Sequence, residues 1–142
     1  MAYFSFVDKY FKGEAISIYN NGDYENDLMR DFTYIDDIVE GIVRLIPLPP
    51  VGKDPFRVLN IGNHNPEKLM TFISTLEECL SQSLGKKVEF RKKFEPMKPG
   101  DVPVTYAATD QLRSIVDFSP STPLREGLQK FTDWYVNSRK AY

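Results

Sequence analysis

Apolar residues recur every three or four positions in five stretches of the chain, which is the spacing of an amphipathic helix. Gly13 and Gly85 follow two of these stretches as C-terminal glycines, and Pro47 ends another. Asn65 and Thr122 stand where N-terminal caps are expected, each before a proline that suits the first helical turn. The pattern therefore predicts helices, the fourth of them short, over residues 2–12, 35–46, 66–84, 110–115 and 123–135.

Between these stretches, apolar and β-branched residues alternate at period two over short runs. Asn20, Asn21 and Gly22 follow the first run and favour a turn, because these residue types tolerate positive φ. The alternation predicts short strands at residues 16–19, 31–34, 56–61, 88–90 and 105–107. Interleaved helices and strands indicate the α/β class, as a small mixed α+β unit, with residues 1–142 as one domain.

Charge and cysteine content narrow the possible partners. The 142 residues carry a formal net charge of −2 and a sequence pI of about 5.4, so no global positive field points to nucleic acid. One basic cluster is interpreted as a solvated face rather than an RNA site; it comprises Lys86, Lys87, Arg91, Lys92 and Lys93. Asp8 and Lys9 interrupt the apolar start far short of a signal or membrane-spanning segment. Cys79 lies on an apolar helical stripe, where a buried thiol is expected. The expectation is a cytoplasmic protein without a nucleic-acid or membrane partner.

Arg30 stands just before the predicted strand at residues 31–34 and beside a long polar loop. A planar guanidinium in such a place can pair bidentately with a diphosphate. A surface arginine without a ligand is the alternative interpretation. Asp36 and Asp37 follow at the start of the next predicted helix, where carboxylates favour the helix N-terminus, so they need no catalytic role.

Three runs of sequence carry a family resemblance: RDFTYIDDIVEGI at residues 30–42, MKPGDVPVTYA at 97–107 and PSTPLREGL at 120–128. They resemble the C-terminal portion of extended short-chain dehydrogenase/reductase enzymes that act on nucleotide sugars, most closely the NAD-dependent UDP-glucuronate 4-epimerases. The resemblance covers nearly the whole chain. It implies the C-terminal, nucleotide-sugar-binding portion of a UDP-sugar 4-epimerase, with the Rossmann half absent.

The resemblance also implies which residues meet a UDP-sugar. Arg30 is similar to the family arginine that contacts the phosphates, and Asp101 to the aspartate that accepts hydrogen bonds from ribose hydroxyls; a turn aspartate is the alternative. Lys98 stands where many relatives have arginine and adds a point charge near the phosphates. Ser17 and Tyr19 lie on a strand that presents backbone groups to uracil, although a plain edge strand would look the same.

The parts that would carry the redox chemistry are missing from the sequence. No glycine-rich turn of the kind that holds the NAD pyrophosphate occurs, and no helix carries a Tyr-x-x-x-Lys pair. His64 has no second histidine or cysteine at ligand spacing, so a metal site has no support. We expect that this chain binds no NAD, that NAD belongs to the complete enzyme, and that the chain alone, as a fragment, is inactive.

Two alternatives stay open at this stage. One is the corresponding portion of a UDP-sugar decarboxylase or a dTDP-sugar dehydratase, which would share the fold and Arg30. The other is a noncatalytic interaction module that uses the basic cluster or an exposed strand. The strand predicted at residues 58–61 would have no sheet to join without the Rossmann half, so self-association through it is a further expectation.

Overall fold

The computed structural model describes residues 2–20, 22–23, 27–53 and 55–140, so Asn21 of the predicted turn lies outside the described residues. The five expected helices are present as α1 (Ala2–Lys12), α2 (Ile35–Leu45), α3 (Leu69–Leu84), α4 (Asp110–Val116) and α5 (Leu124–Lys140). The strands are β1 (Ile16–Ile18), β2 (Met29–Arg30), β3 (Glu67–Lys68) and β4 (Lys92–Phe94). The chain is thus a small mixed α/β unit, as its pattern predicts.

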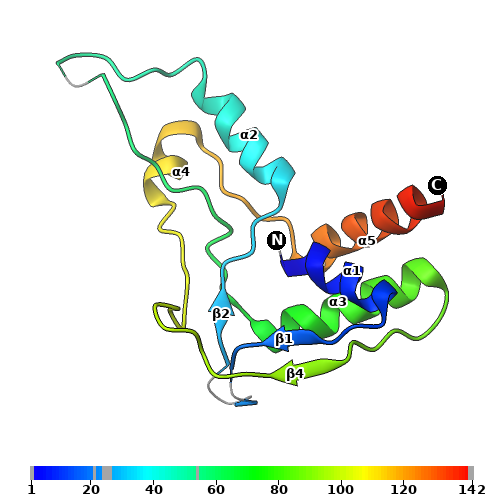
Figure 1. The fold of residues 1–142 in the computed structure, drawn as a ribbon. Helices are drawn as coiled ribbons and strands as arrows, with labels where there is room; N and C mark the ends of the chain where they lie inside the picture. The colour runs from blue at the N-terminus through cyan, green and yellow to red at the C-terminus, as the bar shows by residue number, and fades with distance from the viewer. Residues whose placement is uncertain (1, 21, 24–26, 54, 141–142) are drawn as a thin grey trace.

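The helices α1, α3 and α5 lie together beside the β1–β4 pair, whereas α2 and α4 stand apart on the other side (Figure 1). The buried apolar residues gather in the first group, where α3 packs against α5. They are Val7, Ile16, Ile18, Phe72, Ile73, Leu76, Cys79, Leu80, Val88, Phe90, Leu128, Tyr135 and Val136. Cys79 is fully buried, as expected, and burial raises the pKa of its thiol.

Two small sheets organise the strands. β1 and β4 pair in parallel, with Ile16 opposite Lys92 and Ile18 opposite Phe94. β2 and β3 pair antiparallel, with Arg30 opposite Glu67. On its other side β2 meets the segment around Val104 in a single parallel bridge, so residues 29–30 lie between two chain segments.

Two predicted strands form at other residues than expected. In the first case, side chains accept the hydrogen bonds of the backbone amides. The prediction of a strand at residues 88–90 is wrong, because Val88 donates to Ser81 Oγ at 2.9 Å and Phe90 donates to Glu77 Oε1 at 2.6 Å. The strand forms later, as β4. The prediction at residues 31–34 is also wrong: the ladder ends at Arg30.

The strand predictions at residues 56–61 and 105–107 are wrong as well. Among the described residues, no strand pairs with 56–61, and a strand needs a neighbour to satisfy its backbone groups. Residues 105–107 contribute one backbone hydrogen bond, from the Thr105 amide to the Met29 carbonyl at 3.1 Å, and no ladder follows.

The start of α3 differs from the prediction, which placed its cap at Asn65. The helix begins at Leu69, and the cap comes from a distant segment: Asp27 Oδ2 accepts from the Met70 amide at 2.7 Å. The α3 start is therefore fixed by a tertiary contact. Thr122, before α5, is also in a tertiary contact, since its hydroxyl donates to Asp37 Oδ1 at 3.0 Å.

One face of α2 remains in solvent although its apolar stripe predicts burial. α2 packs through the face that carries Gly41, where an added Cβ would lie 3.5 Å from Ile61 and 3.6 Å from the Phe118 ring. Among the exposed large apolar side chains of α2 and the following segment, we group seven as the α2 surface: Ile35, Val39, Ile42, Val43, Ile46, Phe56 and Val58. Ile46 is 71% exposed and Val58 is 79% exposed. Exposed apolar side chains gathered along one helix are typical of a docking surface.

Candidate functional site

The Arg30 side chain is held by its own strand and by the segment at residues 101–103. Its Nη1 donates to the Met29 carbonyl at 2.8 Å and lies 3.4 Å from the Pro103 carbonyl. Its Nη2 lies 3.8 Å from Asp101 Oδ1. The Arg30 side chain keeps 26% of its surface in solvent, and that of Asp101 keeps 41%. The guanidinium is therefore oriented by carbonyls and one carboxylate while its remaining donors stay accessible.

A tight turn at residues 98–101 brings the predicted residues together. The Asp101 amide donates to the Lys98 carbonyl at 3.1 Å, and Gly100 adopts φ +88°, which favours glycine. From this turn Asp101 reaches Arg30, and the Lys98 ammonium lies 4.3 Å from the centre of the Tyr19 ring. Residues 19, 30, 98 and 101, proposed from distant parts of the sequence, thus form one continuous group.

Ser17 and Tyr19 present free backbone groups at the outer edge of β1. In a parallel pair, the backbone groups of every second residue point to the same neighbouring strand. Ile16 N donates to Arg91 O at 2.7 Å and Ile18 O accepts from Glu95 N at 2.8 Å, so the backbone groups of Ile16 and Ile18 point to β4. The backbone groups of Ser17 and Tyr19 consequently point to the opposite edge, where no strand pairs within the described ranges. The Ser17 hydroxyl itself donates to Glu95 Oε1 at 3.1 Å.

Glu95 adds a carboxylate beside this edge strand. Lys93 Nζ lies 3.2 Å from Glu95 Oε1, and hydrogen bonds from Lys93 and then from Ser17 lower the pKa of Glu95 below its usual value of 4.5. The group is therefore ionised at neutral pH. Its negative charge balances the lysines nearby.

Asp31 is an organising residue that sequence reasoning missed. Its Oδ2 accepts from the His64 amide at 3.1 Å and from the Ala107 amide at 3.1 Å, and its Oδ1 lies 3.5 Å from the Asn65 amide. Gly62 fits beneath this junction only as glycine, since an added Cβ would lie 2.9 Å from Asp31 Oδ2 and 2.3 Å from Ala107 Cβ. Asp31 therefore joins two remote segments directly beside Arg30.

His64 lies in the same junction rather than in an isolated loop. Its Nδ1 lies 2.9 Å from the Ala107 carbonyl oxygen, which can only accept, so Nδ1 carries a hydrogen. In the neutral imidazole, Nε2 then accepts from the Tyr106 hydroxyl at 2.8 Å. His64 has φ 56°, an uncommon conformation for a side chain of this size. No spacing rule relates residues 42 positions apart, so the pair had no sequence signal.

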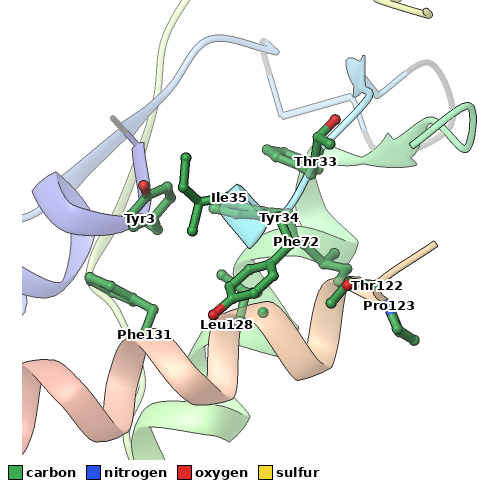
Figure 2. A pocket seen from close by; sticks show the side chains of 12 residues that line it. Tyr3, Thr33, Tyr34, Ile35, Phe72, Thr122, Pro123, Leu128 and Phe131 are labelled. Atoms are coloured by element: carbon green, nitrogen blue, oxygen red, sulfur yellow. The ribbon is translucent and has the colours of Figure 1, made fainter. Parts of the chain in front are cut away.

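An apolar pocket of about 130 Å³ lies elsewhere, between α1, α5 and the chain that enters α2 (Figure 2). The rings of Tyr3, Phe72 and Phe131 line it together with Leu128. None of its lining residues is charged. It therefore offers no charge that could neutralise a diphosphate.

Two helix N-termini of the described residues do not suit the pyrophosphate of NAD. A helix N-terminus binds a pyrophosphate through its free amides. The first turn of α2 carries Asp36 and Asp37, and the start of α3 is already occupied by the Asp27 carboxylate. Within the same residues, no group of three metal-ligating side chains exists and no helix could span a membrane.

Comparisons with known proteins show what the chain resembles, although no protein-family model matches. Protein CapI of Staphylococcus aureus is 41% identical over 154 residues, which cover 99% of this chain and 43% of that protein. The probable UDP-glucuronate 4-epimerase of Rhizobium meliloti is 39% identical over 158 residues, covering 100% of this chain and 43% of that protein. The UDP-glucuronic acid 4-epimerase of Bacillus cereus, in complex with UDP-glucuronic acid and NAD, matches with TM-score 0.72 and 26% identity, over 100% of this chain and 40% of that one.

The fold is that of the C-terminal part of NAD-dependent nucleotide-sugar epimerases and dehydratases. The chain spans less than half the length of the relatives it matches. Within this class, it matches the C-terminal portion of UDP-glucuronate 4-epimerase-like enzymes.

Proposed function

We propose that this chain is the UDP-sugar-binding portion of an NAD-dependent UDP-glucuronate 4-epimerase. Arg30 would pair with the diphosphate, Lys98 would add charge, Asp101 would accept from the ribose hydroxyls, and the outer edge of β1 at Ser17 and Tyr19 would meet the base. The single observation that carries the proposal is the turn at residues 98–101, which places Lys98 on Tyr19 and Asp101 beside Arg30. The proposal includes the cytoplasmic location expected from the sequence.

The chain would bind the substrate without transforming it. NAD and the proton-transferring residues would come from the part of the enzyme that the relatives have and this chain does not cover. The α2 surface supports this, because its seven exposed apolar side chains need a cover and the chain matches only about 40% of the B. cereus enzyme. The partner we propose there is the dinucleotide-binding α/β half. Without it, two copies of the chain would associate through the same surface.

Titration with UDP tests the binding role. Chemical-shift changes should follow Arg30 and the edge of β1, with weak affinity because half of the site is missing. Arg30→Ala removes charge-assisted hydrogen bonds worth about 1.5–3 kcal/mol, so affinity should fall roughly ten- to hundredfold. Arg113→Ala, which removes an exposed arginine from α4, is the matched control and should change nothing. An equal response of the parent and Arg30→Ala would contradict the proposal.

The same titration separates the alternatives. A portion of a UDP-sugar decarboxylase would also bind UDP, and only the reconstituted enzyme with UDP-glucuronate distinguishes it by product. A dTDP-sugar dehydratase portion should prefer dTDP. A preference for UDP would favour the UDP-sugar interpretations, because the deoxyribose of dTDP lacks one of the hydroxyls from which Asp101 would accept a hydrogen bond. A noncatalytic interaction module should bind neither nucleotide.

A further inference from the structure

Lys98 makes an unusual contact for an exposed lysine. Its ammonium lies 4.3 Å from the centre of the Tyr19 ring. Tyr19 is half-buried and Lys98 is exposed, so the lysine covers the ring from the solvent side. The negative face of an aromatic ring attracts a cation, and an exposed contact of this kind is worth about two- to fivefold in an equilibrium constant. The ring face is therefore occupied in the free chain.

The position of Lys98 allows its ammonium to reach a second binding partner. The turn that carries it also carries Asp101, whose carboxylate lies beside Arg30. A lysine has a long, flexible stem and three donors that can rotate, so its ammonium can move without any change in the turn. A diphosphate bound at Arg30 would offer it a far stronger partner than a ring face.

The ring face is also the surface that a nucleobase would use. Bases stack on aromatic side chains, and the free backbone groups of Ser17 and Tyr19 point to the same edge of β1. A base that stacks on Tyr19 must first displace the ammonium. Lys98 would therefore oppose any ligand that has only a base and would assist one that also carries phosphate.

We propose that Lys98 is a specificity residue that covers Tyr19 in the free chain and transfers to the diphosphate when a uridine nucleotide binds. This inference rests on the proposed function and assigns one of its residues two states. The chain would thereby discriminate against nucleosides without phosphate, because only a contact with phosphate offsets the free energy lost when the ammonium leaves the ring.

Opposite effects on two ligands test this inference. In Lys98→Ala, uridine should bind about two- to fivefold more tightly because the ring is free. UDP should bind about three- to tenfold more weakly because one phosphate partner is lost. Lys98→Met keeps an apolar stem of similar length over the ring, so UDP should weaken without the gain for uridine. Lys87→Ala, with the same charge change at a remote and highly exposed position, should alter neither.

A direct observation accompanies the affinities. In the free chain, the Lys98 Hε protons should resonate upfield of those of Lys87, because they lie over the Tyr19 ring, and UDP should abolish the difference. Effects of Lys98→Ala in the same direction for both ligands, or a Lys98 signal without ring-current shift, would overturn the inference alone. A parent chain that responds to neither uridine nor UDP would refute the proposed function and this inference together.

Discussion

The junction at Asp31 gives the sharpest prediction for stability. Asp31→Ala removes the acceptor of the His64 and Ala107 amides, both at 3.1 Å, while the Asn65 contact at 3.5 Å contributes little. A hydrogen bond to a charged group contributes about 1.5–3 kcal/mol, and the partial exposure of this junction favours the lower end. We expect the free energy of unfolding to fall by about 2–3 kcal/mol, since two such bonds are lost.

Urea denaturation followed by circular dichroism measures this change. A loss of 2–3 kcal/mol should lower the urea midpoint by about 1 M or more without changing the slope. Asp31→Asn keeps one acceptor oxygen but no charge and should lose about half as much. Asp8→Ala is the control, because it breaks the solvent-exposed Lys12 pair and should lower the free energy of unfolding much less than Asp31→Ala.

The UDP titration of the same variants checks the structural role. Asp31 follows Arg30 directly, so Asp31→Asn should weaken UDP binding although it leaves the guanidinium in place. If Asp31→Ala lowers the free energy of unfolding no more than Asp8→Ala does, the amides of His64, Asn65 and Ala107 bond to water instead. The junction would then not organise the site.

Three further expectations follow from other contacts. Ser17→Ala should raise the pKa of Glu95 part of the way to its usual 4.5, because the Lys93 bond remains; carbon-detected titration of the carboxyl would show no change if Ser17 were unimportant. Because the folded pKa is lowered, the contribution of Glu95 to stability is present above pH 4.5 and is lost as pH falls through the folded pKa. Calorimetry with millimolar NAD should give no saturable heat, and a clear isotherm would contradict the assignment of NAD to the remaining half. Sedimentation should show self-association that Val58→Lys weakens more than Leu59→Lys does, because Val58 is exposed and Leu59 is half-buried. A monomeric parent at high concentration would contradict this expectation.

The helices could be predicted from the sequence because their periodicity is local. α2 was expected at residues 35–46 and occupies Ile35–Leu45. The start of α3 could not be predicted, because its cap is Asp27, 43 positions before Met70. The strand at residues 88–90 failed for a similar reason, since Ser81 and Glu77 on α3 take its amides. Short strands depend on long-range partners that a local pattern does not contain.

The candidate site could likewise be predicted from the sequence only in part. Arg30, Lys98 and Asp101 entered through a family resemblance, and their proximity required the turn at residues 98–101. Asp31 and the His64–Tyr106 pair had no signal, because each contact joins segments far apart in the chain. The exposure of the α2 stripe was also unexpected. An amphipathic pattern shows that a face is apolar but not which body covers it.

The junction at Asp31 also connects the α2 surface to the proposed nucleotide site. Residues 56–61 carry part of that surface and lead directly into Gly62 and His64, which pack against Asp31 without space for an added Cβ at Gly62. A partner that orders residues 56–61 would therefore also hold the segment beside Arg30. By thermodynamic linkage, the coupling must act in both directions: the dinucleotide-binding half should tighten UDP binding by the same factor by which UDP tightens binding of that half. Gly62→Ala would strain the junction itself and should weaken this coupling even though it touches neither ligand.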